Sequence, residues 1–248
     1  MVKLGQNFLA DRNLLEAIVR DAALSPDDVV LEVGAGEGVL TERLAEVARQ
    51  VHVIEIDRGL EPGLVEVMAR PNVNMVWADA VRYDLSQLDP APTAMVANLP
   101  YAVATPVILQ TAFELPGIAS WNVMVQKEIG DRLRAGPGSK TYGAPSVLIQ
   151  LAGEVRQVRK VSRTVFRPQP RVDSAIIAIR RTGPGPDPAT RRLVRAGSPT
   201  AARRWPGRST WSTPARSRRS GPGWRRPGWT LASGPKPWRP SSSQSFPG

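Results

Sequence analysis

The chain has 248 residues, enough for one large domain or for a main domain with a small one. It contains no cysteine and a single histidine, which excludes disulfides, thiolate metal sites and a histidine-rich metal centre. The sequence has neither an apolar run long enough to span a membrane nor the pattern of a signal peptide. We therefore expect a soluble cytoplasmic protein that holds no metal.

The net charge of +11 is unevenly distributed along the chain. Residues 183–248 carry 13 of the 33 Lys and Arg residues and one acid, Asp187. Residues 1–182 carry 20 basic and 21 acidic residues. The basic excess therefore belongs to the last quarter of the chain, and it is weak evidence for an RNA partner of the folded part.

Predicted strands and helices alternate along the first part of the chain. The strands are expected at 29–33, 51–56, 73–77, 94–97 and 122–125, and the helices after Asp11, around 40–47, near 59–69, at 103–113 and near 127–134. Repeated β-α units predict an α/β fold with a doubly wound, mostly parallel sheet of the Rossmann-like type. Two later β-rich runs, near 153–162 and 172–180, lack a helix-length connection, so we expect an antiparallel hairpin.

A glycine-rich loop follows the first predicted strand. Residues 32–38 read EVGAGEG, with Gly34, Gly36 and Gly38 at alternating positions. Such glycines let the backbone approach a ligand where a Cβ would clash. The spacing departs from the G-x-G-x-x-G loop of dinucleotide enzymes and matches the E-x-G-x-G-x-G loop of methyltransferases. A tight turn without a ligand is the alternative interpretation.

Two carboxylates at strand ends support the interpretation of the loop as a cofactor site. Glu55 ends the second strand, where an acid would accept hydrogen bonds from ribose hydroxyls, and Asp79 ends the third, near the expected adenine end of a cofactor. Either residue alone is more simply read as the cap of a turn. Together with the glycine-rich loop after the first strand, these acids place an expected cofactor-binding group at the ends of three consecutive strands. This arrangement predicts binding of S-adenosylmethionine.

The fourth predicted strand ends in the tetrapeptide Asn98-Leu99-Pro100-Tyr101. An adenine amino nitrogen is a poor nucleophile, and acceptors on its two hydrogens, the Asn98 side-chain oxygen and the Leu99 carbonyl, would favour attack on a sulfonium methyl. Pro100 stiffens the turn, and Tyr101 offers a face on which an extruded base can stack. The alternative is an ordinary Asn-x-Pro turn. Related N-P-P-Y motifs act on DNA adenine or glutamine, so the motif does not name the substrate.

Five motifs in order carry a resemblance to a known family. They are residues 5–9 (GQNFL), 32–38, 98–101, 125–128 (VQKE) and 166–174 (FRPQPRVDS). Together they resemble the ribosomal RNA adenine dimethyltransferases over roughly residues 3–182. The likeness is greatest to the small-subunit branch, which dimethylates two adjacent adenosines near the 3′ end of 16S ribosomal RNA during ribosome biogenesis. The large-subunit branch, which confers macrolide resistance, is the alternative, although N-I-P-F is more usual there.

The resemblance also implies roles for individual residues. Asn7 and Leu9 would close over the cofactor. Gly34, Gly36, Glu55, Asp79 and Asn98 would contact it or its surroundings. Phe166 would form the second wall of the target-base pocket opposite Tyr101. Candidate contacts to RNA phosphates are Arg132, Arg134, Lys140, Arg167 and Arg171. The expected partner is small-subunit ribosomal RNA or a precursor of that subunit, and we expect a monomer.

The sequence pattern divides the chain into three parts. Residues 1–182 are expected to form the methyltransferase domain, and 183–196 a linker and the start of a small helical domain. Residues 197–248 form an Arg-, Pro-, Trp- and Ser-rich tail that we expect to be disordered. A changed reading frame near 196–197 and a genuine basic arm that binds RNA both remain open. The family's C-terminal helical domain, which helps to hold the RNA, is missing or frameshifted in this interpretation, so a non-catalytic RNA-binding or assembly protein is an alternative to the enzyme.

Overall fold

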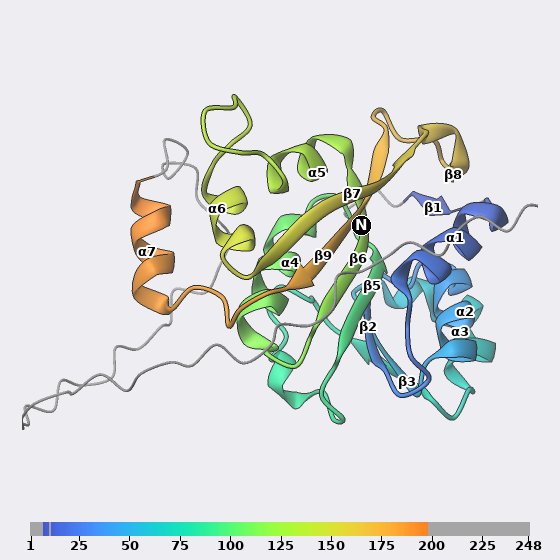
Figure 1. Ribbon diagram of the computed structural model, residues 1–248. Coiled ribbons are helices and arrows are strands. Elements are labelled where there is room, and N and C mark those ends of the chain that lie inside the picture. Colours follow the sequence, from blue (N-terminus) through green and yellow to red (C-terminus); the bar gives the residue numbers. More distant parts are fainter. Residues whose placement is uncertain (1–6, 10, 198–248) are drawn as a thin grey trace, which may run out of the picture. The chain divides into compact units, whose positions relative to one another are not determined.

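A computed structural model of the chain describes residues 7–9 and 11–197 (Figure 1). The chain divides into two units, Met1–Ser209 and Thr210–Gly248, and all described residues belong to the first. The tail predicted at 197–248 lies outside the described residues, apart from Gly197, and so do the first two residues of the GQNFL motif.

Seven strands of the described part form one sheet in the order β4-β3-β2-β5-β6-β9-β7. Their bounds are β2 (Val29–Val33), β3 (Gln50–Glu55), β4 (Val73–Trp77), β5 (Ala94–Asn98), β6 (Ser120–Gln126), β7 (Gly153–Val161) and β9 (Ser174–Arg181). The strands from β2 to β6 run parallel, whereas β9 pairs antiparallel with both β6 and β7. The predicted mostly parallel sheet with a C-terminal antiparallel hairpin is thus confirmed.

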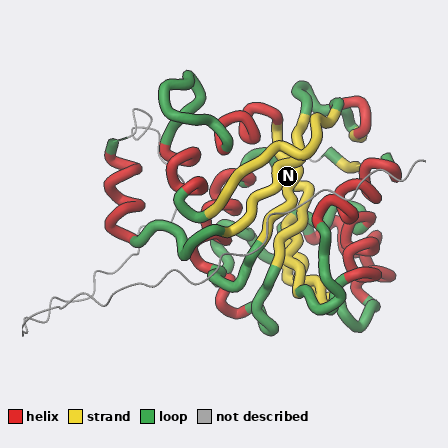
Figure 2. The backbone as a smooth tube through the Cα atoms, viewed as in Figure 1, coloured by secondary structure: helices red, strands yellow, loops and turns green. Residues whose placement is uncertain are grey.

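Helices cover both faces of the sheet (Figures 1 and 2). They are α1 (Arg12–Ala22), α2 (Val39–Val47), α3 (Glu61–Met68), α4 (Ala104–Glu114), α5 (Lys127–Leu133), α6 (Ala144–Gln150) and α7 (Pro188–Ala196), with short 3₁₀ turns η1 (Arg58–Leu60), η2 (Leu85–Gln87) and η3 (Arg163–Val165). One apolar core lies between the sheet and α1, α2 and α3, and a second lies beneath α4, α5 and α6. Because both faces are covered, the central strand β2 is buried at all five of its positions rather than at alternate ones.

Two features of the fold were not predicted from the sequence. Helix α6 has seven residues, too few to establish a helical period, and it begins after Gly143 with a proline in its first turn. Strands β1 (Phe8–Leu9) and β8 (Phe166–Arg167) have two residues each and pair antiparallel, with Leu9 opposite Phe166. This pairing joins the GQNFL motif to the FRPQPRVDS motif, and no local pattern signals it.

The strand order locates the region where a ligand should bind. From β2 the chain builds outward through β3 and β4, then returns to the other side of β2 as β5 and β6. Connections therefore leave β2 and β5 in opposite directions, which opens a crevice at the carboxyl ends of the strands. The glycine-rich loop, Glu55 and Asn98 all lie at these ends.

Arg181 joins the end of β9 to the end of α4. Its guanidinium donates hydrogen bonds to the carbonyls of Ala112 (3.2 Å), Leu115 (3.0 Å) and Ile118 (2.6 Å) and lies 4.9 Å from the Trp121 ring centroid. A cation that bonds the last carbonyls of a helix also interacts favourably with the helix dipole.

Replacing Arg181 with alanine is therefore expected to lower the free energy of unfolding by roughly 2–4 kcal/mol, because several carbonyls lose a charged donor at once. Urea denaturation of the two proteins measures the difference. Arg180→Ala is the matched control, since its exposed side chain should matter little. Equal stability losses in the two variants would contradict this role for Arg181.

Candidate functional site

One cavity at the carboxyl ends of the strands brings together most of the predicted site residues. It is lined by Asn7, Leu9, Gly34, Gly36, Glu55, Asp79, Asn98, Leu99, Pro100 and Tyr101, among others. These residues come from five separate segments of the chain. Of the residues predicted for the site, Phe166 alone does not line this cavity.

The glycine-rich loop passes close to two neighbouring motifs. Gly34 has a φ of +85°, and a Cβ there would lie 3.1 Å from the Pro100 ring. Gly36 has a φ of +56°, and a Cβ there would lie 3.2 Å from the ring of Phe8. Both positions thus combine a left-handed backbone with little space, so a side chain would be strained at either one.

Glu55 and Asp79 both bond the turns that follow their strands. One Glu55 oxygen accepts from the amides of Ile56 and Asp57 at 2.8 Å, while the other lies 3.4 Å from the Gly36 amide. Asp79 accepts from the Val81 amide at 3.0 Å. The turn-capping interpretation is therefore correct for both residues. Both carboxylates also line the cavity, and their contacts to ribose and adenine stay predictions.

Glu32, the first residue of the EVGAGEG loop, is a cavity residue that the predicted set left out. Its side chain is 0% exposed, and neither carboxylate oxygen has a hydrogen-bond partner. Burial, with a smaller contribution from the charge of Glu55, raises the pKa of Glu32 to about 8. The nearby Thr41 hydroxyl acts in the opposite direction, but its oxygen makes no hydrogen bond of good geometry. Glu32 is thus a buried acid that lacks a counter-charge.

The tetrapeptide that begins at the last residue of β5 contacts the backbone of two other segments. The Leu99 amide donates to the carbonyl of Met124 on β6 at 3.0 Å. The Asn98 side-chain nitrogen faces the carbonyl of Asn7 at 3.5 Å, so the amide oxygen of Asn98 points the other way. This orientation makes the oxygen available to accept a hydrogen bond from a ligand.

Tyr101 and Phe166, the two predicted aromatic walls, differ in their surroundings. Tyr101 lines the cavity, and its hydroxyl lies 2.8 Å from that of Ser174. Burial raises the pKa of the Tyr101 phenol, and the bond with Ser174 acts in the opposite direction. Phe166 is 2% exposed and packs in the same core as Leu9. Its burial fits a core position, and its role as a second wall stays a prediction.

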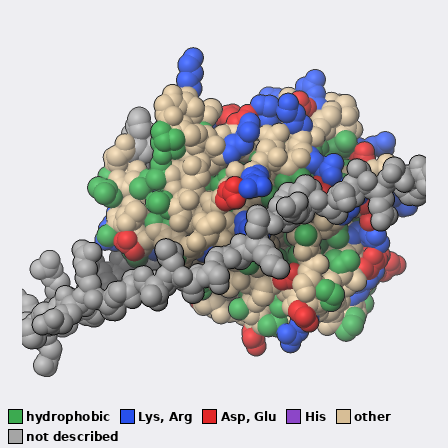
Figure 3. All heavy atoms as spheres, in the orientation of Figure 1, with side chains coloured by type: hydrophobic (Ala, Val, Ile, Leu, Met, Phe, Trp, Pro, Cys, Tyr) green, Lys and Arg blue, Asp and Glu red, His purple; other side chains and the backbone are tan. Residues whose placement is uncertain are grey.

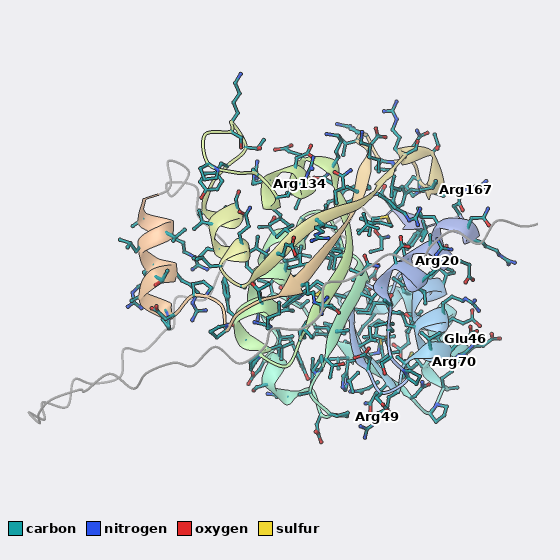
Figure 4. The ribbon with its side chains drawn as sticks, in the orientation of Figure 1. Arg20, Glu46, Arg49, Arg70, Arg134 and Arg167 are labelled. Carbon is teal, nitrogen blue, oxygen red and sulfur yellow. The ribbon has the colours of Figure 1, made fainter. Side chains whose placement is uncertain are left out.

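Two of the candidate phosphate contacts, Arg134 at the end of α5 and Arg167 in β8, are exposed and are labelled in Figure 4. Arg132 pairs with Glu128 at 2.8 Å and Arg134 with Asp131 at 3.0 Å, so both arginines are already paired with acids of α5. The other three candidates, Lys140, Arg167 and Arg171, are exposed. Figure 3 shows Lys and Arg side chains gathered over α5, β7 and β8. Their contact with RNA stays a prediction.

Several apolar cavity residues were also missed by the sequence analysis. Phe8, Ile56 and Ala80 each directly neighbour a predicted polar residue in the sequence. Ile56 is largely exposed although it is a large aliphatic side chain, which is a signal that only the structure provides. These side chains supply the apolar walls that ligand cavities commonly have.

The described residues contain neither a membrane-spanning helix nor a cluster of metal-ligating side chains. Within 7–9 and 11–197, no helix is long and apolar enough to cross a membrane. In the same part of the chain, no group of three or more His, Cys, Asp or Glu residues could hold a metal ion.

Comparison with known proteins identifies a family. The model of the family described as "Ribosomal RNA adenine dimethylase" matches residues 2–193. The chain is 46% identical over 192 residues to "Ribosomal RNA small subunit methyltransferase A" of Rhodococcus erythropolis, which covers 75% of this chain and 64% of that relative. It is 42% identical to the protein of the same name from Rubrobacter xylanophilus, covering 82% and 78%. The chain thus spans less than two thirds of the Rhodococcus relative.

Solved structures agree with this assignment. A dimethyladenosine transferase from Plasmodium falciparum superposes with a TM-score of 0.64 at 28% identity, covering 71% of this chain and 63% of that one. The 23S rRNA methyltransferase ErmE superposes with a TM-score of 0.63 at 34% identity, covering 75% of each chain.

Proposed function

Because the chain belongs to the ribosomal RNA adenine dimethylase family, we propose that it transfers methyl groups from S-adenosylmethionine to the exocyclic amino groups of two adjacent adenosines near the 3′ end of 16S ribosomal RNA. The product is dimethyladenosine. One observation carries the proposal: the glycine-rich loop, the strand-end acids and the tetrapeptide at Asn98 line a single cavity.

The cavity fits S-adenosylmethionine in shape and charge. The space beside Gly34 and Gly36 would be filled by a Cβ, so the loop can follow a ligand closely. Glu32 lacks a partner inside the cavity, and a ligand that carries positive charge would provide one. S-adenosylmethionine carries both a sulfonium and an ammonium group. Glu55 and Asp79 would hold its ribose and adenine, and Asn7 and Leu9 would cover it.

The chain's own residues would orient the target base and accept hydrogen bonds from it. The bound cofactor supplies an activated methyl group, so no metal and no strong base are required. The Asn98 side-chain oxygen and the Leu99 carbonyl would accept the two amino hydrogens, which moves lone-pair density from the ring onto the nitrogen. Tyr101 would stack on the base and hold the nitrogen in line with the methyl group.

The small ribosomal subunit is the proposed partner. The relatives that are 42–46% identical carry the small-subunit name, whereas the 23S methyltransferase structure is 34% identical. The large-subunit alternative is therefore not favoured. Acting as a monomer on a subunit precursor, the chain would work in the cytoplasm.

The ends of the proposed domain rest on sequence alone. We propose that residues 1–182 form the methyltransferase domain and that 183–196, which include α7, begin a further helical part. Tail residues 198–248 lie outside the described residues. Sequencing the gene tests the reading-frame hypothesis. An alternative frame that encodes helical segments would support the hypothesis, and the absence of such a frame would refute it.

Titration calorimetry tests the cofactor site. We expect S-adenosylmethionine to bind the wild-type chain, and Gly36→Ala to weaken binding at least about tenfold, since left-handed strain costs roughly 1–2 kcal/mol and the Cβ crowds Phe8. Gly63→Ala is the matched control, because its Cβ meets nothing within 4 Å. Absence of binding by the wild-type chain would reject the proposed function.

A further inference from the structure

A hydrogen bond joins two motifs that lie far apart in the sequence. The hydroxyl groups of Tyr101 and Ser174 are 2.8 Å apart. Ser174 is 1% exposed and begins β9, where it lies opposite Gln126 of β6 and Val161 of β7. A residue paired on both sides cannot shift without disturbing the sheet. Ser174 is therefore a fixed anchor for the polar end of the Tyr101 ring.

The segment that leads into Ser174 is also held in place. The carbonyl of Asp173 accepts from the amide of Lys127 at 2.9 Å, where α5 begins. Its carboxylate accepts from the amide of Arg163 at 3.1 Å. The anchor thus stands on a loop that is bonded to both η3 and α5, and its position does not depend on the tetrapeptide.

The orientation of the Tyr101 ring matters because a stacked base lies parallel to it. Pro100 restricts the backbone before Tyr101 but leaves the side-chain torsions free. The ring shares the cavity with Asn98, so its plane determines where the amino group of a stacked base lies relative to the Asn98 oxygen. Small errors of placement at a reacting centre cost large factors in rate.

We infer that Ser174 is a positioning residue, which sets the plane in which Tyr101 receives the target adenine through the bond between their hydroxyl groups. The inference rests on the proposed function. Burial raises the pKa of the Tyr101 phenol further above its ordinary value of 10.0, so both hydroxyls keep their protons at neutral pH and either one can donate. No catalytic contact by Ser174 itself is required.

A double-mutant cycle of Ser174→Ala and Tyr101→Phe tests the inference. Each variant removes one hydroxyl of the same bond, and Tyr101→Phe keeps the stacking face. We expect kcat for methyl transfer to small subunits to fall roughly 3- to 10-fold in each single variant, the range of one hydrogen bond. The double variant should fall no further, because the two changes remove one interaction. Cofactor affinity should stay within about twofold.

Ser146→Ala is the matched control, since its buried hydroxyl donates to the Arg132 carbonyl and does not line the cavity. It should lower thermal stability but keep kcat. If the kcat losses of the two single variants multiply in the double variant, the inference is wrong. It is also wrong if Ser174→Ala keeps the wild-type kcat while Tyr101→Ala is inactive. Either result would leave the proposed function intact. Full activity of Tyr101→Ala would instead contradict the stacking role in the proposed function.

Discussion

In an Asn98→Ala variant, the rate of methyl transfer is expected to fall by roughly 10²- to 10³-fold, the loss typical of removing one preorganised hydrogen-bonding group from a reacting centre. The Asn98 side-chain nitrogen faces the Asn7 carbonyl, so the Asn98 side-chain oxygen points away from Asn7 before a substrate arrives. Alanine removes that acceptor. The Leu99 carbonyl and the Tyr101 ring remain, which is why some activity should survive.

Single-turnover kinetics with bound cofactor measure this loss separately from changes in cofactor affinity. Asn72→Ala is the matched control, because its amide donates to the Ala45 and Ala48 carbonyls and does not line the cavity. It should lower stability and leave the transfer rate unchanged. A rate for Asn98→Ala within about threefold of wild type would refute the proposed mechanism.

Glu32 is expected to make the ligand-free protein less stable as the pH rises. Its pKa is about 8 in the folded chain against an ordinary value of 4.5, so between these values the folded state binds more protons than the unfolded state. Stability contributed by the protonated carboxyl is fully present below pH 4.5 and is lost as the pH rises through about 8. The loss amounts to roughly 3–5 kcal/mol, at 1.36 kcal/mol per pH unit.

Chemical denaturation of wild type and Glu32→Gln between pH 5 and pH 9 would test this. Glutamine does not ionise, so the difference in unfolding free energy between the two proteins should shift in favour of the variant by about that amount as the pH rises. Comparing the two proteins cancels the contribution of His52 to the pH dependence. His52 is buried, and its lowered pKa destabilises the fold as the pH falls below 6.5. If the unfolding free energies of wild type and Glu32→Gln change in parallel with pH, Glu32 is not a buried, unpaired acid.

The sheet and the main cavity could be predicted because their signals are local. The central strands are largely apolar, and the glycines, Glu55, Asp79 and Asn98 lie at or just after the carboxyl ends of these strands. In parallel sheets the carboxyl ends of the strands meet at one edge, so the order of motifs along the chain was enough to gather them.

The rest of the site depends on contacts between distant segments. The β1–β8 pairing and the bond from Tyr101 to Ser174 join residues far apart in the sequence, and neither has a pattern of its own. Glu32 stood inside a recognised motif, but its lack of a partner is a property of the packed structure. Phe166 was assigned to the site by the resemblance alone; its ring is buried, and its role as a wall stays a prediction.

The most direct test of the proposed function is transfer of labelled methyl groups from S-adenosylmethionine to unmodified small and large ribosomal subunits, assayed side by side. We predict that label enters small-subunit RNA alone and is recovered as dimethyladenosine at two adjacent positions. Label in the large subunit would assign the chain to the other branch of its family. Absence of transfer to either subunit, by a chain that binds the cofactor, would contradict the proposed activity and favour a non-catalytic role in subunit assembly.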